Sequence, residues 1–582
     1  MKGYFVVGLL LVLGVSAKCL IKSSGPVKQF PDADRFNKPI SSLPASWNWA
    51  DVNGTNYLTI PRNQHIPEYC GSCWAFGSTS ALSDRFKIMF NATWPDINIA
   101  PQVAVSCVKD GCFGCNGGDA IKVYEYIHKN GITDETCQIY QARGWTNGLD
   151  CGKLSICETC DPNGNCYVPK GYHLYNVTQY GIIKGEQQMI NALQEGPIAC
   201  DMDATPEFDQ YNGGIFNQTL PAGSETNHVI SIVGYGEEEG VKYWYGRNSW
   251  GTYWGEKGGF FKIVRGENTN LIESNCAWAT PDSTIKRIDS STRTSTFRAP
   301  KHKSCRTEKV TFEGGERITG PRSWELLEGV QMPRSWDWRN ISGVNYLSWN
   351  KNQHIPHYCG SCWAQGTTSA FADRIKIMTQ NRFPTLGIAP QVVINCRAGG
   401  TCEGGNPGGV WQFANTHGIP DETCQQYLAK DPENFECSPI QVCENCVPPP
   451  APPSGHSNCS AVQRPHLYYV GDYGYVAGPD HMKKEIYKHG PIGCGMMVTK
   501  EFEEYTGGIY SQWTLFPQIN HEVSIVGWGV SETGEEYWIV RNSWGTAWGE
   551  EGFFRIRMYR DNLGIETDCD YGIPDLARSG IA

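Results

Sequence analysis

Three residue types that together can turn a thiol into a nucleophile occur twice in this chain, in the same order. In the first set, Cys73 lies in Cys-Gly-Ser-Cys-Trp-Ala, His228 comes later, and Asn248 begins Asn-Ser-Trp-Gly. A thiolate attacks carbonyl carbons readily, and a neighbouring imidazole can hold it ionised and then supply a proton. An asparagine can orient that imidazole. The order of these residues therefore indicates covalent catalysis through sulfur.

The second set consists of Cys362, His521 and Asn542. A Cys-x-x-Cys motif alone would also fit a redox pair, half of a zinc site, or a disulfide cysteine beside a nucleophile. A lone histidine is more often structural than catalytic. Because the whole order of cysteine, histidine and asparagine recurs, we prefer the interpretation that Cys73 and Cys362 are nucleophiles. A thiol oxidoreductase is the weakest alternative, because it needs neither the histidine nor the asparagine.

The repeated order belongs to a tandem duplication. Several segments recur, namely 63–67 and 69–75 at 352–356 and 358–364, 134–137 at 421–424, and 247–252 at 541–546. The period is too long for a solenoid, so each copy is a whole folded unit. We predict a signal peptide at 1–17, a short pro-segment at 18–42, a first unit at 43–282, a linker with a second pro-segment at 283–332, and a second unit at 333–582. The linker is polar and basic and is expected to be exposed, with 286–287 and 301–303 open to proteases.

Each copy must position its nucleophile with helices and its histidine with strands. Apolar residues after Cys73 recur at helical spacing, and residues 120–129 indicate another helix. Residues 229–233, 243–245 and 260–264 are typical of strands. A cysteine at a helix N-terminus has its thiolate stabilised by the helix dipole. The fold class predicted for each unit is therefore α+β, helical first and β-rich later.

Composition limits the location and the partners of the protein. The chain has 582 residues and a net charge of -11, which argues against a nucleic-acid partner. A basic start, an apolar run over 4–15 and small residues to Ala17 predict a secretory signal peptide, and no later stretch predicts a membrane span. The 25 cysteines favour an oxidising compartment. We expect the secretory pathway, either a lysosomal or acidic vesicle or the extracellular space, with candidate glycosylation sites at Asn53, Asn91, Asn176, Asn217, Asn340 and Asn458.

These motifs resemble the papain-like cysteine peptidases. The resemblance rests on Gln64 with 70–75, on 115–118, on 227–228 and on 248–251, and it covers nearly the whole chain twice. It implies a helical lobe bearing the cysteine, a β-rich lobe bearing the histidine and asparagine, and a peptide or protein substrate in the cleft between them. It implies no cofactor and no metal, and we expect a monomer that is open to cleavage into two units.

The resemblance also assigns residues around the nucleophiles. Gln64 and Gln353 would form oxyanion holes with the backbone N–H of the nucleophilic cysteine. The residues expected at the substrate are Gly118 and Gly405, whose backbones would meet the residue before the scissile one, together with Trp250 and Trp544.

A longer segment after each glutamine narrows the resemblance. His65 and His354 both begin His-Ile-Pro, which, with 335–340 and 418–424, is similar to the cathepsin X (cathepsin Z) type. That type implies a carboxypeptidase whose loop histidine receives the terminal carboxylate of the substrate. The alternative is a surface loop that does not touch substrate. Phe76 and Gln365 stand where such members often carry histidine, which leaves the side-chain preference beyond the scissile bond open.

Other functions stay open on the sequence. An endopeptidase, or an exopeptidase of opposite polarity, would use the same three residues. One unit could instead be a binding or inhibitory module, and Tyr245-Gly246, in place of Ile539-Val540, keeps that alternative for the first copy.

The resemblance further implies a set of disulfides. The pairs are Cys70–Cys115, Cys107–Cys151, Cys137–Cys157, Cys160–Cys166 and Cys200–Cys276, and then Cys359–Cys402, Cys396–Cys437, Cys424–Cys443, Cys446–Cys459 and Cys494–Cys569. It also implies that short pro-segments block the nucleophiles through Cys19–Cys73 and Cys305–Cys362. Cys112 is left over, and pairing of Cys19 or Cys305 with it, or no pairing, is the alternative.

Overall fold

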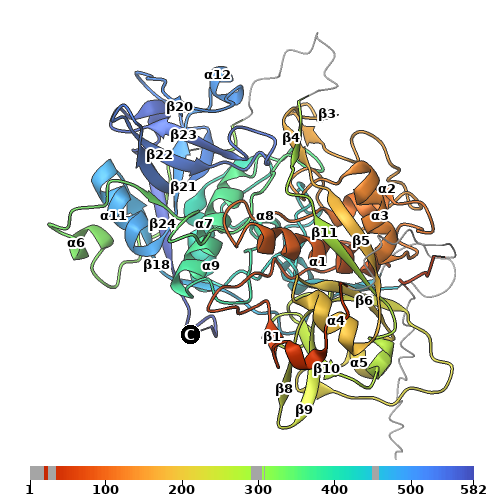
Figure 1. The fold of residues 1–582 in the computed structure, drawn as a ribbon. Helices are drawn as coiled ribbons and strands as arrows, with labels where there is room; N and C mark the ends of the chain where they lie inside the picture. The colour runs from red at the N-terminus through yellow and green to blue at the C-terminus, as the bar shows by residue number, and fades with distance from the viewer. Residues whose placement is uncertain (1–18, 24–34, 290–303, 307, 449–457, 582) are drawn as a thin grey trace, which may run out of the picture.

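The computed structural model describes residues 19–23, 35–289, 304–306, 308–448 and 458–581. The expected signal peptide and the basic residues 301–303 lie outside the described residues. Each copy of the repeat folds into its own unit. Figure 1 shows the first unit in red to yellow-green and the second in green to blue, side by side.

The helices follow the same order in both units. Those of the first are η1 Ile40–Ser42, α1 Cys73–Met89, α2 Pro101–Cys107, α3 Ala120–Asn130, α4 Gly185–Leu193, α5 Pro206–Asp209 and η2 Thr269–Leu271. Those of the second, including its pro-segment, are α6 Ser323–Leu326, α7 Cys362–Met378, α8 Pro390–Asn395, α9 Pro407–Thr416, α10 Pro439–Val442, α11 Pro479–His489, α12 Lys500–Glu503 and η3 Asn562–Gly564. The predicted helices after Cys73 and from Ala120 are confirmed.

The strands repeat as well. In the first unit they are β1 Trp47–Asn48, β2 Thr159–Cys160, β3 Cys166–Tyr167, β4 Tyr172–Leu174, β5 Val177–Ile183, β6 Ile198–Met202, β7 Ile215–Phe216, β8 His228–Glu238, β9 Val241–Arg247, β10 Phe260–Val264, β11 Cys276–Pro281 and β12 Lys286–Ile288. In the second they are β13 Trp336–Asp337, β14 Gly400–Thr401, β15 Gly404–Gly405, β16 Glu444–Val447, β17 Asn458–Ala461, β18 Tyr469–Val476, β19 Ile492–Met496, β20 Ile509–Tyr510, β21 His521–Val530, β22 Glu536–Arg541, β23 Phe553–Arg557 and β24 Cys569–Asp575. The three predicted strands lie within β8, β9 and β10.

One large sheet forms the β-rich lobe of each unit. Its order is β5-β11-β6-β8-β9-β10-β7 in the first and β18-β24-β19-β21-β22-β23-β20 in the second, with β1 and β13 added on β8 and β21. Neighbours are antiparallel except at β7–β10 and β20–β23. The shared order and the helical lobe confirm two α+β units of the same fold.

The central helix of each unit is almost wholly buried, and it connects the two lobes. Helix α1 packs against α2 and α3 on one side and against β8 of the sheet on the other. A Cβ placed on Gly77 would lie 2.8 Å from the Val229 side chain, so a glycine lets helix and strand approach closely. This approach brings the first turn of α1 near the start of β8, which is where Cys73 and His228 lie.

A buried ion pair also joins the lobes. Arg247, at the end of β9, contacts Asp84 of α1 at 2.6 Å, and both side chains are inaccessible to solvent. Arg541 and Asp373 form the same pair in the second unit. Removing one partner of such a pair typically costs about 3–5 kcal/mol, because a charge is left buried alone. The pair fixes the strand that leads into the site asparagine.

Most linker residues that the structure describes are exposed, as expected, including 286–287, but a few are folded onto the units. Strand β12 pairs with β4 of the first unit. Cys305 and Arg306 are fully buried, and Val310 and Phe312 lie in the helical-lobe core of the second unit. A polar composition concealed a few apolar and paired residues that fold onto the two units on either side of the linker.

The two units meet through equivalent surfaces. Asn63 Nδ2 donates to the Thr423 carbonyl at 2.9 Å, and Asn352 Nδ2 donates to the Thr136 carbonyl at 2.9 Å. The same reciprocity holds for Thr252 N with Thr423 Oγ1, Thr546 N with Thr136 Oγ1, and the ring pairs Phe260–Phe383 and Phe553–Trp94. Such mutual contacts are the pattern of a two-fold symmetric dimer, here within one chain.

Candidate active sites

The structure brings the three predicted residues of the first set together. Cys73 begins α1, and its sulfur is bonded to Cys19 of the pro-segment. His228 Nδ1 lies 3.3 Å from the Cys19 sulfur, and its Nε2 lies 2.8 Å from Asn248 Oδ1. All four residues are buried. One ring nitrogen of His228 is thus directed at sulfur, and the other is held by the Asn248 amide.

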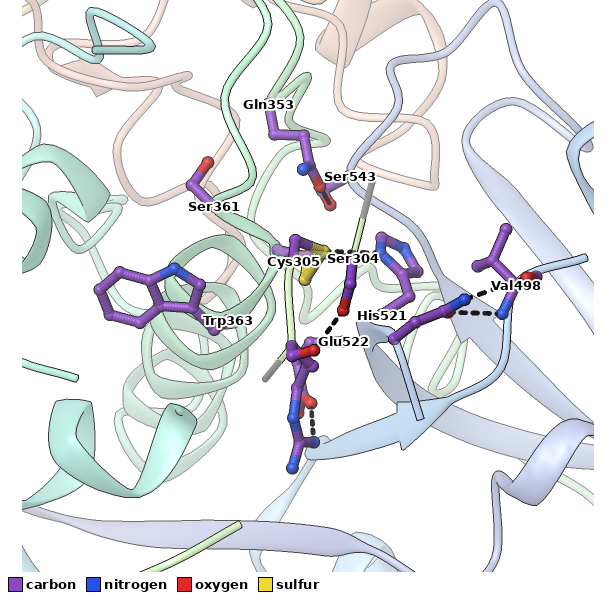
Figure 2. Close-up of a disulfide and its surroundings, with 12 residues drawn as sticks. Ser304, Cys305, Gln353, Ser361, Trp363, Val498, His521, Glu522 and Ser543 are labelled. Carbon is purple, nitrogen blue, oxygen red and sulfur yellow. Dashed lines mark hydrogen bonds and ion pairs between the residues drawn. A yellow bond between two sulfur atoms is a disulfide. The ribbon is translucent and has the colours of Figure 1, made fainter. Parts of the chain in front are cut away.

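The second set has the same arrangement. Cys362 begins α7 and is bonded to Cys305. His521 Nδ1 lies 3.2 Å from the Cys305 sulfur, and its Nε2 lies 2.8 Å from Asn542 Oδ1. Figure 2 shows this disulfide with His521 directed at the sulfur.

A tryptophan covers each histidine. The Trp250 ring lies 4.8 Å from the His228 ring, and the Trp544 ring lies 4.9 Å from that of His521. Burial lowers the pKa of His228 to about 4, against the hydrogen bond to Asn248, which raises it. With its thiol partner held in a disulfide, the imidazole therefore lacks the opposite charge that would keep it protonated.

The glutamines lie beside the sulfurs with one amide edge fixed. Gln64 Nε2 donates to the Cys70 carbonyl at 3.1 Å, and its Oε1 accepts from Ser249 Oγ at 2.8 Å. Gln353 makes the equivalent bonds at 3.0 and 2.7 Å, and Figure 2 shows it next to Ser543. A primary amide nitrogen carries two N–H groups, so each glutamine has a second donor to offer an oxyanion.

Gly118 and Gly405 hold the pro-segments by backbone bonds. The Gly118 N–H donates to the Cys19 carbonyl at 3.2 Å, and Ile21 N–H donates to the Gly118 carbonyl at 2.9 Å. The Gly405 N–H donates to the Cys305 carbonyl at 3.2 Å. A Cβ on Gly118 would lie 2.6 Å from the Trp74 ring, so only glycine fits. An extended peptide is thus bound at the position predicted for substrate backbone.

The two loop histidines lie beside the tryptophans that cover the catalytic histidines. His65 stacks on Tyr69 and lies 6.2 Å, ring to ring, from Trp250. His354 stacks on Tyr358 and lies 6.1 Å from Trp544. Both imidazoles are half-buried, and their contact with substrate stays a prediction.

Sequence reasoning missed a feature of these loops: a disulfide hairpin of the opposite unit covers each one. In the hairpin β16–β17, the sulfurs of Cys446 and Cys459 lie 3.7 and 3.8 Å from the Pro67 carbonyl oxygen. These are contacts and not hydrogen bonds, since a disulfide sulfur carries no proton. Asn445 of the same hairpin lies near the His65 side chain and raises its pKa.

The hairpin β2–β3 of the first unit covers the other loop. The Cys160 N–H donates to the His354 carbonyl at 3.0 Å, and the Cys160 sulfur lies 3.5 Å from the Pro356 carbonyl oxygen. The hairpin cysteines were predicted as disulfides, but nothing in their spacing says which surface they would meet. Burial, followed by the charge of His228, lowers the pKa of His65 to about 3.

All predicted disulfides are present in the structure. Cys157 and Cys160 belong to two different disulfides, so neither offers the thiolate that a zinc half-site requires. Cys112 is a free, buried thiol whose pKa burial raises to about 12. It pairs with neither blocking cysteine. Phe76 is buried against Tyr140, with ring centres 4.6 Å apart.

The described residues contain no helix with the length and apolar character needed to cross a bilayer.

Comparison with known proteins assigns the class. The model of the papain family cysteine proteases matches residues 43–280 and again 332–573. The chain therefore belongs to the papain family, with two tandem copies of its domain, and it is a cysteine-type peptidase.

Individual relatives align with about one unit. Cathepsin Z of Onchocerca volvulus is 49% identical over 266 residues, which are 44% of this chain and 83% of that protein. Cathepsin B-like protease 1 of Arabidopsis thaliana is 32% identical over 226 residues, 37% of this chain and 56% of that protein. Among solved structures, the bromelain protease of Ananas comosus in complex with the E64 inhibitor is 28% identical, with a TM-score of 0.33, covering 41% of this chain and 99% of that one.

Proposed function

We propose that both units are active carboxypeptidases that remove residues from the carboxyl end of peptides through a cysteine thiolate. The observation that carries this proposal is the same in both clefts: a Cys–His–Asn set with a loop histidine beside the tryptophan of that set.

The chemistry uses each side chain in the position described above. The Cys73 thiolate attacks the scissile carbonyl carbon, and the oxygen that becomes negative is stabilised by Gln64 and the Cys73 backbone N–H. Losing one such donor typically costs about 10²–10³ in rate. Protonated His228 then gives its proton to the leaving amine, and the neutral ring removes a proton from the water that hydrolyses the acyl-enzyme. Asn248 keeps the ring oriented. Cys362, His521, Asn542 and Gln353 have these roles in the second unit.

The loop histidines would make each unit act at the carboxyl end of a peptide. His65 and His354 lie beside the tryptophans that cover the catalytic histidines, and we place the residues after the scissile bond next to them. A terminal carboxylate placed there would raise the pKa of His65, because an opposite charge favours the protonated imidazole. The 49% identity to Cathepsin Z supports this direction.

The pro-segments would keep both units latent. In this state each nucleophile is oxidised and cannot attack. A thiolate reductant would attack the sulfur of Cys19 or Cys305, form a mixed disulfide with it, and release Cys73 or Cys362 as the leaving thiolate. A thiolate of low pKa is a good leaving group even at acidic pH, which suits activation in a lysosome or another acidic vesicle. Activation in the extracellular space is the alternative. We expect the protein to enter that pathway through the signal peptide at 1–17 and to act as a monomer.

Single-nucleophile variants of the full chain, after mild reduction, test the proposal. Cys362→Ala leaves only the first unit and Cys73→Ala only the second. Each should cleave a peptide with a free carboxyl terminus and leave its amidated twin nearly uncut. Equal cleavage of both peptides would instead make the unit an endopeptidase, and an inactive variant would make the remaining unit a binding module.

A further inference from the structure

The residue that follows each blocking cysteine fills a pocket beside the catalytic histidine, and the two pockets differ in charge. Leu20 forms a parallel backbone bridge with Gly118, and Arg306 forms the equivalent bridge with Gly405. Both side chains are buried. Because these glycines would also bind the residue before the scissile one, the two pro-segment side chains mark where that substrate residue would go.

Arg306 is held by carboxylates on all its outer nitrogens. Its Nη1 forms an ion pair with Glu522, the residue after His521, and its Nη2 contacts Asp568 at 2.6 Å. Nη2 also donates to the Glu308 carbonyl at 3.1 Å. The guanidinium is 1% exposed. Figure 2 shows Glu522 next to the disulfide that blocks the nucleophile.

A third carboxylate and two glycines complete this pocket. A Cβ on Gly493 would lie 2.8 Å from both Asp570 Oδ1 and Glu522 Oε1. A Cβ on Gly495 would lie 2.6 Å from Arg306 Nη1. The two glycines therefore leave the space that the carboxylates and the guanidinium occupy. The three acidic residues and the two glycines together form the pocket.

Strand register identifies the corresponding positions of the first unit. Glu522 corresponds to Val229, Asp568 to Asn275, Asp570 to Ala277, Gly493 to Ala199 and Gly495 to Asp201. Leu20 lies in the same buried apolar cluster as Val229 and Ala277. Asp201 accepts from Asn275 Nδ2 at 2.8 Å, and burial raises its pKa to about 7.

Departure of the second pro-segment would leave buried carboxylates without their cation. In the described part of the chain, Arg306 is the cation within ion-pair distance of Glu522 and Asp568. Burial raises the pKa of Glu522 well above its usual value and that of Asp570 to about 6, while Arg306 opposes both shifts. A guanidinium and these carboxylates each favour the charged form of the other, so the pocket is chemically matched to another cation.

We propose that the second unit selects peptides with arginine, and less strongly lysine, at the residue before the scissile one, whereas the first unit selects an apolar side chain there. This inference rests on the proposed function. Arginine exceeds lysine because its planar fork can meet Glu522 and Asp568 together, as Arg306 does. For a carboxypeptidase the selected residue is the third from the carboxyl end.

The test uses two peptides that differ only in arginine or leucine at the third position from a free carboxyl end. With Cys73→Ala, which leaves the second unit, we expect kcat/KM for the arginine peptide to be about ten- to a hundredfold higher. With Cys362→Ala, the leucine peptide should be preferred. Equal kcat/KM values in the second unit would overturn the inference. Inactivity of both variants toward both peptides would refute the proposed function instead.

Pocket variants in the Cys73→Ala background assign the preference to the carboxylates. Glu522→Gln with Asp568→Asn should abolish the preference for arginine, so that the ratio of kcat/KM for the two peptides approaches one. Glu501→Gln changes an exposed glutamate of the same unit and is the matched control. Active-site titration corrects for any misfolded fraction. A preference that survives the two pocket substitutions would contradict the role of these carboxylates.

Discussion

The two units have nearly the same catalytic geometry and opposite pockets. The distance from the blocking sulfur to histidine Nδ1 is 3.3 Å in one and 3.2 Å in the other, and the histidine-to-asparagine distance is 2.8 Å in both. Yet the pocket that adjoins them is apolar around Leu20 and anionic around Arg306. The fold holds the reacting atoms through helix and strand positions, while side chains on β19, β21 and β24 can change together. The duplicated units thus share the positions of the catalytic residues and differ in the side chains of the adjoining pocket.

The largest difference expected between variants comes from the nucleophiles. Replacing Cys73 and Cys362 together by alanine should lower peptidase activity by about 10⁶-fold, the size seen when a covalent nucleophile is removed. Either replacement alone should leave the activity of the other unit. Turnover assays on the purified, reduced variants check this. Substantial turnover by the double variant would show that another group performs the chemistry.

The loop histidines should show a smaller, selective effect in both units. His65→Ala, in the Cys362→Ala background, removes a charge-assisted hydrogen bond to the terminal carboxylate and should lower kcat/KM about ten- to a hundredfold. His354→Ala is the matched change in the Cys73→Ala background.

Amidated peptides serve as the control for both histidine variants. Their slow cleavage should be unaffected, because they offer no carboxylate. If each variant loses as much activity on the amidated peptide as on the free one, the loops are structural supports and the two units do not read the carboxyl end.

Site residues that lie in contiguous motifs could be predicted from the sequence. Those that only strand pairing brings together were missed. The helix from Cys73, the strand from His228 and every disulfide followed from local patterns and from the resemblance. Glu522 and Asp568 are separated by 46 positions in the chain and meet only because β24 and β21 both pair with β19. The available signal for the anionic pocket was the glutamate directly after His521, where the first copy has valine.

The covering hairpins provide a further comparison, because only one of them has an asparagine directly before its first cysteine. Asn445 precedes Cys446 in β16, whereas Thr159 precedes Cys160 in β2. The Asn445 side chain favours the protonated form of His65, which would bind the carboxylate. Asn445→Ala should therefore reduce the free-carboxylate activity of the first unit about two- to tenfold, from across the interface. Val447→Ala, an exposed change on the same hairpin, is the control.

The measurement for Asn445→Ala is kcat/KM in the Cys362→Ala background, repeated in the Cys73→Ala background. Only the first should change, since Asn445 contacts His65 and belongs to the second unit. An effect confined to the second unit would contradict a contribution of this hairpin to the neighbouring site.

The smallest effect expected is a shared dependence of stability on pH. Burial raises the pKa of Glu158 and of Glu444, which occupy matching positions, to about 7. Between their ordinary pKa near 4.5 and about 7, the folded chain holds protons that the unfolded chain has lost, so stability decreases as pH rises through this window. Glu158→Gln with Glu444→Gln should flatten the fall of Tm between pH 5 and 7. An unchanged slope would show that these carboxyls ionise normally.

The most direct test of two latent nucleophiles is alkylation of the intact precursor followed by peptide mapping. Before reduction, Cys73 and Cys362 should be unlabelled and should be recovered in peptides linked to Cys19 and Cys305. After mild reduction at acidic pH, both should be labelled, and peptide mapping distinguishes them from Cys19 and Cys305, the other two thiols that this reduction releases. Labelling of either cysteine in the unreduced precursor, or failure of either to react after reduction, would contradict the conclusion that the chain carries two blocked and equivalent active sites.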